Sequence, residues 1–183
     1  LGLLGARISR HSSGFYRIDE ILPGHNWDKK YRSPLTEIGV NVKVGDFIVA
    51  LDGKPANQLI DLYAGLVGKA DRQVTLRVNG EPKTEGARDQ VVIPTGDEQP
   101  LYYLKWVLSN IEAVSKATSN RVGYVHVPDM SAAGLNEFTK FYYAQLDRDA
   151  LIVDCRGNGG GNVSPMIIER LRREPVMWNI ARN

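Results

Sequence analysis

One segment limits the possible folds of this chain more than any other: an apolar run that opens directly into a cluster of glycines, at Leu151–Gly161. The run Ala150–Cys155 is almost entirely apolar, which is typical of a strand buried on both faces of a parallel sheet. Glycines follow because a sharp turn out of a strand needs backbone conformations that other residues rarely adopt. A helix is expected next, near Val163–Arg173. The segment therefore predicts a strand–loop–helix unit in an α/β layer.

The residues before this unit predict a helix, then a strand and a second helix. Pro100 suits the first position of a helix, and an apolar stripe then runs as far as Ser119, through Leu101, Leu104, Leu108, Ile111 and Val114. A strand is expected at Arg121–Val127, where Pro128 stops it. The next helix has one apolar face, formed by Leu135, Phe138, Phe141, Tyr142 and Leu146. Alternating strands and helices of this kind predict a right-handed crossover between parallel strands.

The first half of the chain has a different pattern, with short apolar runs broken by Gly, Pro, Asn or Asp: Phe15–Leu22, Asp46–Leu51, Gln73–Val78 and Gln90–Ile93. This pattern predicts a small β-rich domain. One helix is expected within it, capped by Asn57 and carrying Leu59, Leu62 and Leu66 before Gly68. The polar, turn-rich segment Pro94–Gln99 suggests a boundary between domains at 1–95 and 99–183.

Composition excludes several classes of function. A net charge of +2 without a basic stripe argues against nucleic-acid binding. No apolar run is long enough to cross a membrane, so no membrane partner is expected. One cysteine and three scattered histidines provide no metal-ligand spacing, so neither a metal nor another cofactor is expected. The chain starts without Met or a basic leader, and is expected to be an internal piece of a longer protein.

Four short motifs in the first half closely resemble the PDZ domain of bacterial proteases, over residues 1–95: Ser33-Pro34-Leu35, Gly39-Val40, Val44–Ile48 and Leu51-Asp52-Gly53. PDZ domains bind an extended peptide as an added strand and hold its terminal carboxylate with backbone N–H groups. The resemblance implies that the carboxylate-binding loop is formed by Leu4, Gly5 and Ala6. It also implies that Leu59, Leu62 and Leu66 form the other wall of the groove, although these leucines could equally belong to the core.

The runs Arg121–Met130 and Asp154–Gly161, placed after a PDZ domain, resemble the tricorn and C-terminal processing serine peptidases. In that family a backbone N–H of the glycine loop forms half of the oxyanion hole. By position this role falls to Gly160, with Gly159 next to it, while Asp154 and Arg156 are expected to brace the loop. Cys155, in a buried strand, is expected to be inert. A dinucleotide-binding fingerprint is excluded because its last glycine is missing, and a P-loop is excluded because no Gly-Lys-Ser/Thr follows.

The resemblance also implies what this chain lacks. The family's nucleophilic serine follows the glycine loop in a later segment, and its Ser-His pair precedes the PDZ domain. Local substitutes are rejected: His11 and Ser13 are too close in sequence to face each other productively, and His25 and His126 have no evident triad partners. The chain is therefore expected to be an inactive part of a serine endopeptidase.

The partners expected of this chain are peptide or protein substrates with C-terminal or extended segments. A homo-oligomeric parent is also expected, in the cytoplasm or periplasm. The competing hypothesis is a non-catalytic PDZ module for peptide recognition or scaffolding. A parallel sheet with an open edge, and an apolar helix face at Met166, Ile167 and Leu171, predicts self-association. The alternative expectation is local disorder near 174–183.

Overall fold

The computed structural model describes residues 1–174, which form two compact units, the first spanning Leu1–Trp106 and the second beginning at Val107. The division falls within helix α1, Gln99–Ala117. The sequence placed the boundary slightly earlier, at 95–99, and the domain limits 1–95 and 99–183 stay a prediction. Residues 175–183, which include the end of the second predicted domain and most of the segment expected to be disordered, lie outside the described residues. The expected mixed fold class, a β-rich part followed by helices and strands, is confirmed.

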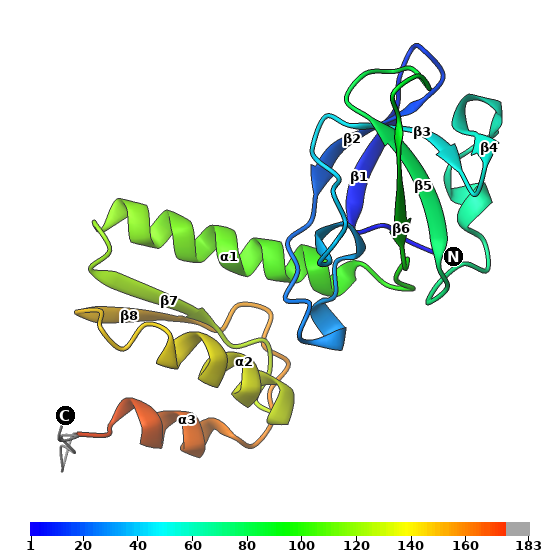
Figure 1. Cartoon of the computed structure of the whole chain (residues 1–183). Coiled ribbons are helices and arrows are strands. Elements are labelled where there is room, and N and C mark those ends of the chain that lie inside the picture. The colour runs from blue at the N-terminus through cyan, green and yellow to red at the C-terminus, as the bar shows by residue number, and fades with distance from the viewer. Residues whose placement is uncertain (175–183) are drawn as a thin grey trace, which may run out of the picture. The chain divides into compact units, whose positions relative to one another are not determined.

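The first unit is built on one antiparallel sheet, with β1-β2-β3-β5-β6 as its strand order and β4 paired to β3 (Figure 1). Its strands are β1 Ala6–Arg10, β2 Tyr16–Ile21, β3 Phe47–Leu51, β4 Lys54–Pro55, β5 Val74–Asn79 and β6 Arg88–Val92. Asp52 and Gly53 both have positive φ, 47° and 77°, so they form the predicted tight turn between β3 and β4. Within the described sheet β1 pairs only with β2, which leaves its other edge open.

The core of this unit draws on every long strand and on the N-terminal segment. Strand β3 is buried along its whole length. The fully buried members of the core are Leu4, Ile18, Ile48, Val49, Ala56, Leu62, Leu66, Leu76 and Val78. Burial of each valine, leucine or isoleucine side chain in this set contributes roughly 1.5–3 kcal/mol, which outweighs the weak local preferences of the short strands.

The helix predicted around residues 57–68 is wrong. Two separate 3₁₀ turns stand in its place, at Ala56–Gln58 and Tyr63–Leu66. Leu59 has extended backbone dihedrals, and the Asp61 carboxylate accepts the Tyr63 N–H at 3.2 Å. Such local bonds compete with helix formation. The leucine spacing therefore reflects burial by two consecutive turns, not one helical face.

The second unit contains the C-terminal part of α1, the parallel strands β7 Val122–His126 and β8 Ala150–Asp154, and the helices α2 Ala132–Tyr143 and α3 Ser164–Leu171. The two strands run in register from Val122 opposite Ala150 to His126 opposite Asp154. Figure 1 shows α1 on one side of this pair and α2 on the other. Asn110 of α1 bonds the Tyr124 hydroxyl, and α2 packs on β7. The predicted strand–helix–strand–helix order is confirmed.

Burial of β8 differs from the prediction. Ile152 and Val153 keep 45% and 37% of their surface exposed, and Cys155 is exposed just after the strand ends. Leu146, expected on a helix face, lies beyond α2 and is also exposed. The apolar composition of β8 is real, but in this chain β8 has a single described neighbour, β7, and cannot be covered on all sides. No helix among the described residues is long and apolar enough to cross a membrane.

Candidate functional site

The glycine loop between β8 and α3 has three residues in backbone conformations that favour glycine. Gly157, Gly160 and Gly161 have φ of 71°, 88° and 138°. Gly161 also passes so close to Met130 that a Cβ would lie 2.1 Å from the Met130 carbonyl oxygen. The run of glycines is therefore needed both for the turn and for close packing against the neighbouring segment.

The segment that leaves β7 holds the loop from one side. Met130 donates its N–H to the Gly160 carbonyl at 2.8 Å, and its own carbonyl accepts the N–H groups of Asn162 at 2.7 Å and Val163 at 2.9 Å. Ser131 then caps α2 by accepting the Ala133 N–H. The C-terminal ends of both parallel strands thus lead into one bonded cluster of backbone, where ligand sites of α/β sheets commonly form.

The Asn158 side chain forms two hydrogen bonds within the loop region that the sequence did not suggest. Its amide nitrogen donates to the Val127 carbonyl at 2.9 Å, and its amide oxygen accepts the Gly160 N–H at 2.7 Å. The Gly160 N–H, the predicted oxyanion donor, is therefore engaged within the loop itself. An asparagine inside a glycine run was the only available signal, because such side chains often bond nearby backbone.

Asp154 and Arg156 brace the base of the loop, as expected. The Arg156 guanidinium makes a two-pronged contact with the buried Asp154 carboxylate, at 3.0 Å for Nε to Oδ1 and 2.6 Å for Nη2 to Oδ2. The Tyr124 hydroxyl donates to the same carboxylate at 2.6 Å. Arg156 holds the pKa of Asp154 well below its usual range. Burial, together with the bond to Asp154, raises the pKa of Tyr124 to about 12.

The three histidines occupy different settings. His126 is buried, with its Nε2 2.9 Å from the Arg156 carbonyl, as expected for a core histidine. His25 stacks on Trp27 with ring centroids 4.5 Å apart. His11 contacts a hydroxyl, because its Nδ1 lies 3.0 Å from Oγ of Ser13, and its rejection as a catalytic base stays a prediction. The Ser13 N–H also points at that nitrogen, at 3.2 Å. The pair lies on an exposed hairpin turn, which explains how residues two apart can meet.

The predicted carboxylate-binding loop of the first unit already has a carboxylate against it. Gly5 has φ of 68° and donates its N–H to Oε1 of Glu98 at 2.6 Å. The N–H groups of Leu4 and Ala6 also stabilise the ionised Glu98, whereas its burial raises its pKa. Glu98 was not singled out from the sequence; its place just before a predicted helix start was the only signal.

The residues predicted to bind peptide lie mainly in the core. Leu4, Leu62 and Leu66 have no exposed surface and Ala6 has 2%. Leu59 is partly buried against the same core. Peptide binding by these residues stays a prediction, and the core interpretation fits the burial of the three fully buried leucines.

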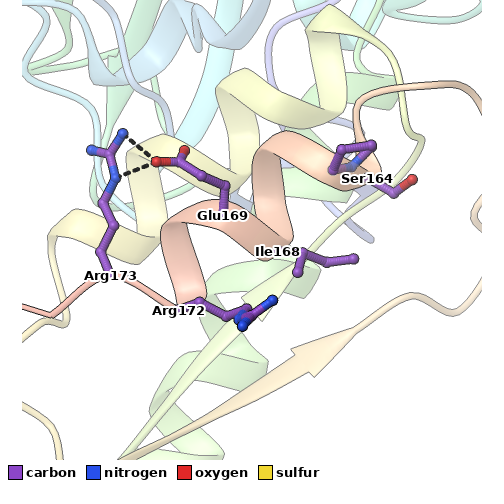
Figure 2. Close-up of a pocket in the computed structure, with 6 residues that line it drawn as sticks. Ser164, Ile168, Glu169, Arg172 and Arg173 are labelled. Carbon is purple, nitrogen blue, oxygen red and sulfur yellow. Dashed lines mark hydrogen bonds and ion pairs between the residues drawn. The ribbon is translucent and has the colours of Figure 1, made fainter.

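Figure 2 shows a hollow elsewhere, along α3, with Ser164, Ile168, Glu169, Arg172 and Arg173 around it. Glu169 of α3 pairs at 2.7 Å with Arg173, which lies two residues beyond the end of the helix. The hollow lies against the surface of one helix, so it offers no converging groups for chemistry. Among the described residues, no group of three His, Cys, Asp or Glu side chains is placed to hold a metal ion.

Comparison with known proteins agrees with both units. Residues 2–97 match the tricorn protease PDZ domain family, and residues 121–175 match peptidase family S41. Tricorn protease homolog 1 of Streptomyces coelicolor is 40% identical over 181 residues, covering 99% of this chain and 17% of that protein. The tricorn protease of Thermoplasma volcanium is 36% identical over 162 residues, covering 88% of this chain and 16% of that protein.

A solved structure, the crystal structure of the tricorn protease, superposes on this chain with a TM-score of 0.83 and 29% identity. The match covers 100% of this chain and 17% of that one, so the chain spans less than a fifth of the length of these relatives. The family model for the PDZ domain alone covers more than half of the 183 residues. The chain therefore belongs to the tricorn protease family, as a tricorn-type PDZ domain followed by a segment of peptidase family S41.

Proposed function

We propose that this chain is part of a tricorn-like serine endopeptidase, in which the glycine loop supplies backbone N–H groups to an oxyanion hole. The observation that carries the proposal is the Gly157–Gly161 loop at the end of β8, which is bonded to the Met130 N–H through the Gly160 carbonyl and is followed by Asn162 and Val163, both bonded to the Met130 carbonyl. An oxyanion hole needs donors that are held in place before the reaction, so that no reorganisation is required when charge develops on the substrate oxygen. The bonds to Met130 fix the backbone of the loop, and the Asn158 side chain is the group that must move to free the Gly160 N–H.

Within the loop, Gly160 and Gly159 are the proposed donors. Since the Asn158 oxygen accepts the Gly160 N–H at 2.7 Å, the Asn158 side chain must turn away before Gly160 can donate to a substrate. A covalent phosphonate adduct of the full-length protein tests the assignment. Its oxyanion is expected about 2.7–3.1 Å from the Gly160 or Gly159 nitrogen. An adduct oxygen bonded to other donors would overturn it.

We also propose that residues 1–183 alone do not hydrolyse peptides. A hydroxyl–imidazole contact among the described residues, Ser13 to His11, lies on an exposed turn where the ring nitrogen faces both the hydroxyl and a backbone N–H. A fluorophosphonate probe is expected to leave the chain unlabelled. Stoichiometric labelling that disappears in Ser13→Ala would refute the proposal.

In the first unit, we propose that an extended peptide adds to the open edge of β1. Ala6–Arg10 has one described partner strand, and three of its five residues are exposed. This edge also favours the second candidate function, a non-catalytic recognition or scaffold module. Probe labelling of the full-length protein separates the two, because a scaffold would show no reactive serine.

A further inference from the structure

We propose that Glu98 is an internal ligand of the loop formed by residues 3–6 (the carboxylate loop), and that it closes this site to the terminal carboxylate of a peptide. The inference rests on the proposed function in one respect, namely that the carboxylate loop belongs to the peptide-binding edge. Its central observation is the 2.6 Å bond from the Gly5 N–H to the Glu98 carboxylate. The two residues are 93 positions apart in the sequence.

The carboxylate loop keeps its shape through bonds that do not involve Glu98. Leu3 exchanges two backbone hydrogen bonds with Thr95, at 2.7 and 2.8 Å, and the Gly5 carbonyl accepts the Leu22 N–H at 2.8 Å. Any Cβ at Gly5 would lie 2.7 Å from the Ser33 hydroxyl oxygen. Removal of the Glu98 carboxylate should therefore leave a preformed anion site and not a collapsed loop.

Glu98 is itself held in position from the other side. Its carbonyl accepts the N–H groups of Leu101 at 2.9 Å and Tyr102 at 3.2 Å, so Glu98 is fixed directly before the first residue of α1, Gln99. Leu101 is buried, so this first turn is anchored in the core. The side chain of Glu98 thus binds the carboxylate loop without the loss of translational and rotational freedom that a free peptide undergoes on binding.

Competition then favours the internal carboxylate. A tethered group has an effective concentration of order millimolar or higher, so a weakly binding peptide terminus is expected to lose roughly tenfold or more in affinity. The site cannot easily hold both groups, because two carboxylates in one pocket repel each other. Asp97 adds negative charge beside Glu98. A peptide bound at β1 should therefore be an extended segment that needs no free C-terminus at this loop.

The experiment follows the Gly5 amide by NMR in the 183-residue chain, with acetate as a minimal carboxylate and an apolar valine-ending pentapeptide as free acid and as amide. In Glu98→Ala, acetate is expected to shift the Gly5 amide saturably, and the free acid to bind about tenfold tighter than the amide. In the unsubstituted chain, acetate should leave Gly5 unmoved and the two peptides should bind within twofold of each other. Glu112→Ala, which removes an exposed glutamate of the helix that follows Glu98, is the matched control.

Two results would overturn the inference: a tenfold preference for the free acid in the unsubstituted chain, or a folded Glu98→Ala that acetate does not affect. If Glu98→Ala fails to fold, Glu98→Gln keeps the test open, since it removes the charge but keeps an acceptor oxygen. Glu98→Gln should then bind the free-acid peptide more tightly than the amide, by a smaller factor than expected for Glu98→Ala. Equal binding of the two peptides to Glu98→Gln would count against the inference. If acetate binds to Glu98→Ala but neither peptide does, the internal ligand is supported and the peptide-binding proposal fails.

Discussion

The Asn158 amide joins two backbone groups from different segments, the Val127 carbonyl at 2.9 Å and the Gly160 N–H at 2.7 Å. Val127 follows β7 directly, and Gly160 lies in the loop that follows β8. One side chain thus links the two strand ends and at the same time occupies the donor proposed for catalysis. In the structure, the Gly160 N–H is therefore bonded inside the loop and is not available to a substrate.

Replacing Asn158 with alanine is expected to release the Gly160 N–H. Amide hydrogen exchange at Gly160 should become about tenfold faster, because one protecting bond worth roughly 1.4 kcal/mol of local opening is lost. Global stability should fall by about 1–2 kcal/mol, since the Val127 carbonyl also loses its partner. Exchange measured by NMR tests the change, with Asn162→Ala as a control in the same loop. Unchanged exchange at Gly160 would mean that the Asn158 contact does not protect it.

Alanine at two glycines of the loop should change stability to different extents. Gly161→Ala is expected to lower the free energy of unfolding by about 1–3 kcal/mol, because its Cβ would clash with the Met130 carbonyl, 2.1 Å away. Gly159→Ala should change stability by less than about 0.5 kcal/mol, since no atom lies within 4 Å of its Cβ position. Urea denaturation of both variants checks this, and equal losses would contradict the described approach to Met130.

The Asp154–Arg156 pair should make the chain sensitive to acid. The folded-state pKa of Asp154 is lowered, chiefly by the Arg156 guanidinium, so its contribution to stability is present above the unfolded pKa of 3.8. That contribution is lost as the pH falls through the folded value. Stability profiles from pH 7 downward should therefore decline less steeply in Asp154→Asn. Profiles of equal slope would show that this carboxylate does not contribute to acid unfolding.

Exposed apolar residues of the second unit should cause self-association, which we propose occurs through β8 and α3. Ile152 and Ile168 are 45% and 53% exposed, and Met166 and Leu171 are exposed as predicted, whereas Ile167 is buried. Ile152→Lys is expected to lower the apparent mass at high concentration, because a charge on an open strand opposes pairing. Light scattering measures the apparent mass. Ile60→Lys in the first unit is the control, because Ile60 is 93% exposed. A concentration-independent monomer before substitution would contradict the proposal.

Some features followed from the sequence because they depend on neighbours along the chain. The Asp52-Gly53 turn, the glycine loop after β8 and the alternation of strands and helices after residue 99 all depend on local backbone preferences. The resemblance to the tricorn family was visible for the same reason, since its motifs are short and contiguous. Burial was less predictable: the leucines at 59–66 suggested a helix, but two turns bury Leu62 and Leu66 equally well.

Long-range contacts decided the rest. The sequence by itself determined only that the chain at Gly5 could adopt a positive φ, observed at 68°, and the resemblance to PDZ domains implied a carboxylate site there. Only the tertiary structure decided which carboxylate, since Glu98 reaches Gly5 through folding of the whole first unit. The glycine loop likewise indicated possible backbone donors. Only the packing of the two strand ends placed the Asn158 amide between the Val127 carbonyl and the Gly160 N–H. Backbone preference is local, whereas the partner of a hydrogen bond depends on the packing of the entire unit.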